Sequence, residues 1–140
     1  MKKQLAKIYL PNNQEVFCLK ADEAKILYQQ VQGYLKYGIV IKEGDIIFDV
    51  GANIGLFALM INNLCDGKAD IFAFEPMPSI FAALDQNANK YNSDKINVFQ
   101  IGLGKQPRTV EFTTLSKCYS YFNYVSRLFR RRKTAVCCNY

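Results

Sequence analysis

Hydrophobic and polar residues follow two different periods in the first part of the chain. Short β-prone runs at residues 8–10 and 16–19 flank Pro-Asn-Asn-Gln, whose residues favour turns, and this pattern predicts a small hairpin. Between residues 21 and 37, apolar positions recur every four residues and acidic residues occupy the first turn, which predicts a helix. Gly38 is expected to end this helix.

The middle of the chain alternates between strand-like and helix-like patterns. Apolar runs predict strands at residues 46–50, 71–74 and 96–101, with a further candidate strand at 109–114. Helical patterns fill the intervals, from residue 54 to 65 and from Pro78 onward. The first run is apolar enough for a strand that is buried on both faces. This order of elements predicts an α/β fold with a parallel, doubly wound sheet and right-handed crossovers.

The length and composition fit one folded domain. The 140 residues are within the usual domain range, and half of them are apolar. No apolar run approaches the ~18–20 residues that a membrane-spanning helix needs, and the N-terminus lacks the pattern of a secretory signal. We therefore expect a cytoplasmic protein.

The cysteines and the absence of histidine limit the possible chemistry. The chain has five cysteines without CxxC spacing, which indicates reduced thiols. Neither a disulfide framework nor a zinc site is therefore expected. Without histidine, the chain lacks the commonest general base near neutral pH and the commonest metal ligand. Any catalysis must use a carboxylate, a lysine, a tyrosine or positioning alone, and no metal is expected.

The excess positive charge belongs to the tail of the chain. Residues 1–114 hold twelve basic and twelve acidic residues, whereas residues 115–140 hold six basic residues and no acid, which accounts for the net charge of +6. One interpretation is a short amphipathic helix that suits an acidic membrane surface or nucleic acid. Its apolar face would consist of Phe122, Val125, Leu128 and Phe129, and its basic face of Arg127 and residues 130–132.

Two other interpretations of this tail stay open. The same basic helix can lie solvated, packed on the domain without a ligand. The abrupt change in composition after Thr114 favours instead a truncated or frame-shifted gene, whose tail has no selected role.

A candidate site lies where the first two predicted strands of the sheet end. Asp49, Gly51, Asn53 and Gly55 follow the first strand, and Glu75 closes the second. Ligands of doubly wound sheets bind outside the carboxyl ends of the strands. Glycines permit a tight turn close to a ligand, and the following helix offers unpaired N–H groups. Read alone, however, the glycines are equally explained by a tight strand-to-helix turn.

The two carboxylates give this site a preference for one class of ligand. Glu75 comes 24 residues after Gly51, where an acidic residue in nucleotide-binding sheets takes up ribose hydroxyls; the alternative is a solvated acid at a strand end. Asp49 would repel a pyrophosphate at the helix start but would stabilise a cation. Asn53 also replaces the second glycine of the dinucleotide motif GxGxxG. S-adenosylmethionine, a cationic nucleoside without phosphate, fits this pattern better than NAD.

These segments resemble a known family. "EGDIIFDVGANIGLFAL", "FAFEPMPSIFAALDQNANKYN" and "INVFQIGLG" are similar to the first half of an FkbM-type methyltransferase, a class I S-adenosylmethionine-dependent family that mostly methylates hydroxyl groups of natural products and sugars. The resemblance covers residues 39–113. It implies that Asp49, Gly51, Asn53 and Gly55 line the methionine and ribose side of the cofactor and that Glu75 holds the ribose.

The resemblance also implies what is missing. Members of the family have a seven-stranded sheet and a later Asp-x-Glu-Gly run, and nothing similar follows Thr114. We therefore expect a Rossmann-like sheet that is truncated after the third or fourth core strand. The expected organisation is an N-terminal hairpin and helix (residues 1–38), a cofactor-binding half-domain (39–114) and a basic tail (115–140).

The expected function follows from the resemblance. It is S-adenosylmethionine-dependent methylation, with O-methylation of a small molecule or sugar as the expected reaction, by a chain that we expect to be an incomplete or inactive fragment. Because Asp49 and Glu75 are assigned to the cofactor, no catalytic base is nominated. The alternatives are a non-catalytic S-adenosylmethionine-binding or interaction module, and a protein that binds RNA or a membrane surface through its tail.

Overall fold

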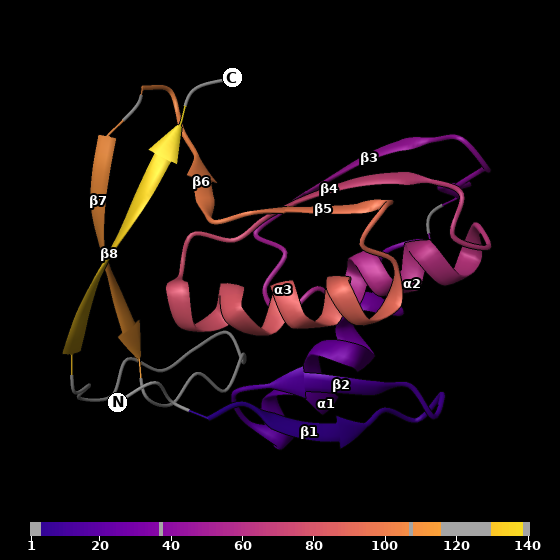
Figure 1. The fold of residues 1–140 in the computed structure, drawn as a ribbon, viewed down its shortest axis with the longest axis horizontal. Helices are drawn as coiled ribbons and strands as arrows, with labels where there is room; N and C mark the ends of the chain where they lie inside the picture. The colour runs from indigo at the N-terminus through magenta and orange to yellow at the C-terminus, as the bar shows by residue number, and fades with distance from the viewer. Residues whose placement is uncertain (1–3, 37, 107, 116–129, 139–140) are drawn as a thin grey trace.

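The computed structural model describes residues 4–36, 38–106, 108–115 and 130–138. In chain order the elements are β1 (Ala6–Tyr9), β2 (Glu15–Cys18), α1 (Ala21–Val31), β3 (Ile46–Val50), α2 (Leu56–Leu64), β4 (Asp70–Phe74), α3 (Pro78–Tyr91), β5 (Ile96–Phe99), β6 (Ile101–Leu103), β7 (Arg108–Leu115) and β8 (Arg130–Cys138). A parallel sheet, the helices α2 and α3, and the β1–β2 hairpin lie one below the other in Figure 1.

The parallel sheet has the strand order β3-β4-β5. Phe48 is the register partner of Phe72, and Phe74 is the partner of both Val50 and Phe99. Helix α2 connects β3 to β4, and α3 connects β4 to β5, as successive βαβ units require. The predicted α/β class with a parallel sheet is confirmed.

One face of this sheet forms the core with α2 and α3. Ile71 and Ala73 of β4 are fully buried on this face, and the helices contribute Leu59, Ile61 and Ala83 to the same interior. Along α3, the buried residues Ala83, Leu84, Asn87 and Ala88 recur at the helical period that the sequence predicts. Within the described residues, the longest helix is α3 with 14 residues, and no helix is long and apolar enough to cross a membrane.

The prediction that the first strand is buried on both faces is wrong. Ile46, Phe48 and Val50 of β3 are 64%, 58% and 60% exposed. The physical reason is that both connecting helices lie on one side of the sheet (Figure 1), and no described helix covers the other side. The sequence of a strand shows how apolar the strand is, but it does not show which element packs on each of its faces.

The N-terminal part confirms the predicted hairpin and shortens the predicted helix. Strands β1 and β2 pair antiparallel, with Ile8 opposite Val16. Helix α1 ends at Val31 rather than near residue 37. The hydrogen bonds that follow span three residues instead of four, as in the bond from the Gly33 N–H to the Gln30 carbonyl at 2.9 Å. The hairpin packs against α3, and α1 packs against α2.

The C-terminal elements form a second sheet with the order β6-β8-β7. The predicted strand at residues 96–101 is divided into β5 and β6, with a bend at Gln100. The predicted strand at 109–114 is confirmed as β7, but it pairs antiparallel with β8 and does not extend the parallel sheet.

The predicted tail helix is corrected where the structure describes the tail. Residues 130–132 lie in strand β8, with Arg131 opposite Thr114 and Arg132 opposite Thr113, because β7 offers this segment a full antiparallel partner. The remaining residues of that predicted helix, among them Phe122, Val125, Leu128 and Phe129, lie outside the described residues.

Candidate functional site

The loop between β3 and α2 is tied to the end of β4. The N–H groups of Gly51 and Ala52 both donate to the carbonyl of Phe74, at 2.9 and 3.0 Å. Gly51, Asn53 and Gly55 all have positive φ, at 78°, 52° and 86°. The loop is therefore a compact turn in the left-handed region, and it joins the carboxyl ends of two neighbouring strands.

The two glycines of the loop have different surroundings. A Cβ atom added at Gly55 would lie 2.6 Å from Cδ1 of Leu84, a buried side chain of α3. A Cβ atom added at Gly51 would meet nothing within 4 Å. Gly55 thus allows α2 to start against α3, whereas Gly51 borders open space at the strand ends.

Glu75 holds the loop and the start of α3 together. Its Oε2 atom accepts a hydrogen bond from the N–H of Asn53 at 3.1 Å, and its Oε1 atom accepts one from the N–H of Met77 at 2.8 Å. The side chain is 6% exposed. Burial raises the pKa of Glu75, and the two amide donors oppose this rise. Each carboxylate oxygen can accept a second hydrogen bond, so Glu75 retains capacity for a ligand.

Asp49 presents an unpaired oxygen beneath the loop. The backbone N–H of Ala58, in the first turn of α2, hydrogen-bonds its carboxylate. The Oδ2 atom is buried and has no hydrogen-bond partner among the described residues. Burial raises the pKa of Asp49 from 3.8 to about 6; the Ala58 N–H lowers it, and the negative charge of Glu75 raises it further.

The site is acidic, and the described residues give it no cationic partner. The four ion pairs found among the described residues involve neither Asp49 nor Glu75. A buried carboxylate oxygen without a donor is costly, so it indicates a missing donor. A cation that donates hydrogen bonds satisfies this requirement, whereas a phosphate would add repulsion. The part of the chain that the structure describes contains no cluster of His, Cys, Asp or Glu suited to a metal.

The structure brings all the residues of the predicted site to the ends of β3 and β4. Those residues are Asp49, Gly51, Asn53, Gly55 and Glu75. In addition, the Oδ1 atom of Asn53 accepts the N–H of Ile54 at 2.8 Å, which stabilises the left-handed conformation of Asn53.

The sequence did not single out Asn87, a fully buried residue of α3 that supports the loop. Its Nδ2 atom donates to the carbonyls of Ile54 at 2.8 Å and Phe17 at 3.0 Å, and its Oδ1 atom accepts the Phe17 N–H at 2.8 Å. One amide therefore links the hairpin to the loop. The available signal is that Asn87 lies beside Leu84 and Ala88 on the apolar side of α3.

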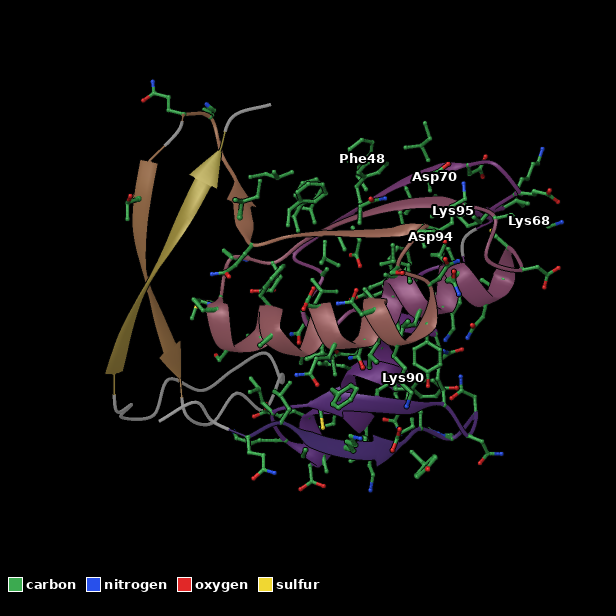
Figure 2. The ribbon with its side chains drawn as sticks, viewed as in Figure 1. Phe48, Lys68, Asp70, Lys90, Asp94 and Lys95 are labelled. Carbon is green, nitrogen blue, oxygen red and sulfur yellow. The ribbon has the colours of Figure 1, made fainter. Side chains whose placement is uncertain are left out.

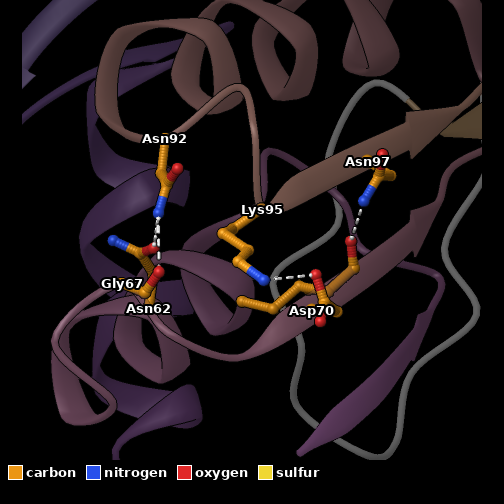
Figure 3. Close-up of polar contacts among 7 residues, drawn as sticks. Asn62, Gly67, Asp70, Asn92, Lys95 and Asn97 are labelled. Atoms are coloured by element: carbon orange, nitrogen blue, oxygen red, sulfur yellow. Dashed lines mark hydrogen bonds and ion pairs between the residues drawn. The ribbon is translucent and has the colours of Figure 1, made fainter. Parts of the chain in front are cut away.

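A second polar cluster lies at the opposite, amino ends of the strands (Figures 2 and 3). Lys95 donates to Asp70 at 2.8 Å, and the side chain of Asn92 donates to Asn62 at 2.8 Å and to the Gly67 carbonyl at 3.1 Å. These groups bond one another, so the cluster connects the turns at the strand starts, and it contains no buried unpaired acceptor among the described residues.

The chain is similar to known methyltransferases. A family model described as the methyltransferase FkbM domain matches residues 49–128. The 31-O-demethyl-FK506 methyltransferase FkbM of Streptomyces tacrolimicus is 42% identical over 85 residues, which are 59% of this chain and 32% of that protein. The hexuronic acid methyltransferase AglP of Haloferax volcanii is 43% identical over 49 residues, 35% of this chain and 19% of that protein.

A solved structure shares the fold. The structure of TYW2 from P. horikoshii in complex with MeSAdo aligns with a TM-score of 0.53 at 18% identity, over 71% of this chain and 37% of that one. The chain therefore spans between a fifth and two fifths of the proteins that it matches here. The family match also continues past Thr114, where the sequence alone shows no further resemblance.

Proposed function

The chain belongs to the methyltransferase FkbM domain family, and from this premise we propose that its strand ends bind S-adenosylmethionine as the cofactor half of a methyltransferase. The observation that carries the proposal is the buried, unpaired Oδ2 atom of Asp49 at the carboxyl end of β3. An ammonium group supplies both the donor and the charge that this oxygen lacks. A sulfonium close by adds a second favourable charge.

The rest of the site suits the other parts of this cofactor. The open space beside Gly51 allows a ligand to approach the backbone, and the amides at the start of α2 lie beside it. Glu75 has spare acceptor capacity for two ribose hydroxyls. The fold is shared with TYW2, whose structure was solved in complex with MeSAdo, and this supports a ligand of the same class.

When bound, the cofactor supplies a methyl group on a positively charged sulfur, which is open to in-line attack by a nucleophile. In this proposal the residues of the chain bind and orient that group and exclude water around it. Asp49 and Glu75 are both committed to binding, so we assign no catalytic base. The acceptor side of the reaction is proposed to lie in polypeptide that the described residues do not supply.

The acceptor is proposed to be a hydroxyl group of a small molecule or sugar. The support is the chemistry in the names of two relatives, one of which acts on a 31-O-demethyl compound and the other on a hexuronic acid. A non-catalytic S-adenosylmethionine-binding module is the second candidate. The observation that favours it is that Asp49 and Glu75, the two carboxylates at this site, are both assigned to the cofactor in this proposal.

Calorimetric titration tests cofactor binding directly. We expect S-adenosylhomocysteine to bind the purified chain at pH 8 and NAD not to bind. Asp49→Asn should weaken binding at least tenfold, because it removes the negative charge that pairs with the ammonium. Asp94→Asn, which removes an exposed carboxylate at the amino end of the sheet, should leave the affinity unchanged (Figure 2). Binding of NAD alone, or equal affinity in Asp49→Asn, would contradict the proposal.

The affinity should also depend on pH through Asp49. Its pKa of about 6 means that the carboxylate is ionised at pH 8 and largely protonated at pH 5. The affinity for S-adenosylhomocysteine should therefore fall as the pH is lowered from 7 to 5, and this fall should be absent in Asp49→Asn. A methyl-transfer assay with hydroxylated acceptors separates the two candidates, since the binding module binds the cofactor without transferring its methyl group.

A further inference from the structure

A cleft opens between the turn of the β1–β2 hairpin, helix α1 and helix α2. Its volume is about 210 Å³, which is below the roughly 300–1,000 Å³ of pockets that hold drug-sized ligands. The cleft therefore has room for one small ring, but not for a nucleotide or a chain of several residues.

The cleft lies across α2 from the proposed cofactor site. Leu56, Met60 and Asn63 line the cleft, and their spacing of four and three residues puts them on one side of the helix. Ala58 and Ile61 are on the opposite side, where they are buried in the core. The helix itself thus separates the cleft from the strand ends, so the cleft is a second site and not a part of the first.

The polar lining of the cleft consists of four amides and one phenol. They are Asn12 and Gln14 of the hairpin, Tyr28 and Gln32 at the C-terminal end of α1, and Asn63 of α2. None of the described residues that line the cleft is Asp, Glu, Lys or Arg. A charged ligand would lose hydration here without meeting an opposite charge, so the cleft favours a neutral ligand.

Part of this lining is held in place, and part has unused hydrogen-bonding groups. Oε1 of Gln14 accepts from Nδ2 of Asn12 at 3.3 Å and from Nδ2 of Asn63 at 3.4 Å, which connects the hairpin to α2. The Tyr28 hydroxyl and the Gln32 side-chain amide have no hydrogen-bond partner in the part of the chain that the structure describes. Amides and hydroxyls both donate and accept, whereas a carboxylate only accepts and an ammonium only donates. Hydroxyl groups of a ligand therefore match this lining best.

The rest of the lining is apolar. Leu10 and Leu56 are 3% and 5% exposed, and Met60 is half-buried. Water molecules beside such side chains lack hydrogen-bond partners on one side, so an apolar group that displaces them gains affinity. A pyranose ring meets both requirements, because it carries hydroxyls around its rim and C–H groups on its faces.

We propose that this cleft binds a neutral, hydroxylated ring of the sugar class, at a site separate from the cofactor site. The hydroxyls of the ring bond to Tyr28, Gln32 and Asn63. The C–H face of the ring lies against Leu56 and Met60. An ionised sugar such as a uronate is disfavoured, because the described lining offers it no cation.

NMR titration of the ¹⁵N-labelled chain tests this proposal, because each side-chain amide gives its own signals. The probes are the neutral methyl glycosides of glucose, galactose and mannose. At least one of them should shift the side-chain amide signals of Gln14, Gln32 and Asn63 at pH 7 in a saturable way. Glucuronate, which is ionised at this pH, should bind at least tenfold more weakly than that probe.

Two pairs of matched variants locate the binding. Gln32→Ala and Tyr28→Phe each remove one hydrogen-bonding group of the cleft and should weaken binding about threefold or more. Gln29→Ala and Tyr34→Phe change the same residue types at exposed positions outside the cleft and should leave the affinity unchanged. Thermal unfolding of each variant verifies that it folds.

Several outcomes would overturn the proposal. They are no shift with any neutral probe, shifts confined to residues outside the cleft, equal affinity for glucuronate, and unchanged affinity in either cleft variant. Tighter binding of N-acetylglycinamide, a neutral peptide-like probe, would overturn it in favour of a peptide ligand. The titration requires neither bound cofactor nor methyl transfer, so this proposal and the proposed function can fail separately.

Discussion

The two faces of the parallel sheet are made by the same strands and have opposite environments. On the face toward the helices, Ile71 and Ala73 are fully buried, and Asp49 lies beneath the loop. On the other face, Phe48 and Val50, which flank Asp49 in the sequence, are 58% and 60% exposed. The helix face holds the fold together and carries the candidate site, whereas Phe48 and Val50 on the other side, which we call the outer face, are largely exposed and contribute less to stability.

The difference follows from connectivity. Two successive crossovers of the same hand put α2 and α3 on one side, so only that side acquires a core within the described residues. The helix face is further fixed by side chains from distant parts of the chain, such as Asn87. Changes on the two faces should therefore have very different energetic costs.

The largest expected effect is that of Asn87→Leu. Removing the amide leaves the N–H and C=O of Phe17 and the C=O of Ile54 without their partner, in a position that is fully buried. Buried polar groups that lose a partner cost about 1–3 kcal/mol each, so we expect a loss of about 3–5 kcal/mol in the free energy of unfolding. Urea denaturation at pH 7 measures it.

Asn97→Leu is the matched control on the outer face, where Asn97 is the register partner of Phe72. Asn97 is half-buried, and its hydrogen bond to the Ile71 carbonyl is long, at 3.5 Å (Figure 3). We expect a change of less than about 1 kcal/mol. Equal costs for the two asparagines would contradict the idea that the helix face carries the stability.

The second expected effect separates the two glycines of the loop. Gly55→Ala places a Cβ atom 2.6 Å from Leu84 at a φ of 86°, so strain and overpacking should lower the free energy of unfolding by about 2–3 kcal/mol. The Cβ atom of Gly51→Ala meets no neighbour, so only the φ of 78° should lower the free energy of unfolding, by about 1 kcal/mol.

Binding should reverse this ranking. The Cβ atom at residue 51 projects into the space proposed for the ligand. Gly51→Ala should therefore weaken binding of S-adenosylhomocysteine more than Gly55→Ala does. Chemical denaturation and calorimetry on both variants measure the two quantities. A larger stability loss at Gly51 than at Gly55 would show that the loop packs differently.

The sequence predicted the site more completely than it predicted its surroundings. Asp49 and Glu75 are 26 residues apart in the sequence, yet their convergence follows from the rule that parallel strands end at one edge of the sheet. The exposure of Phe48 was not predictable, because a strand with one exposed face can have the same composition as a strand that is covered on both faces. Asn87 was missed because its role depends on Phe17, which lies 70 residues away in the sequence.

The third expected effect is a gain of stability in Asp49→Asn. Burial raises the pKa of Asp49 to about 6, so between pH 4 and pH 6 the folded state holds a proton that the unfolded state has lost. The protonated Asp49 carboxyl therefore contributes its full stabilisation of the folded state below pH 4, and this contribution is lost as the pH rises through 6. This shift of the pKa corresponds to about 3 kcal/mol at most. Solvent around the half-buried side chain reduces that figure, so the variant should be about 1–2 kcal/mol more stable at pH 8 and unchanged at pH 4.

Unfolding curves at the two pH values check this gain. Asp94→Asn, with a carboxylate at the exposed amino end of the sheet, serves as the control and should show no gain at pH 8. A variant at Asp49 that is less stable at pH 8 would mean that its Oδ2 atom already has a donor in the folded chain.

The smallest expected effect is that of Phe48→Thr in the isolated chain. Phe48 is 58% exposed, so the substitution gives up mainly its stacking on Phe72 and Phe74, about 1 kcal/mol or less, and threonine is well suited to a strand. Ile71→Thr, at a fully buried position on the helix face, should cost at least about 2 kcal/mol. Urea denaturation of both variants gives the comparison. If Phe48→Thr cost as much as Ile71→Thr, Phe48 would have the environment of a buried side chain in the isolated chain, and the contrast between the two faces would fail.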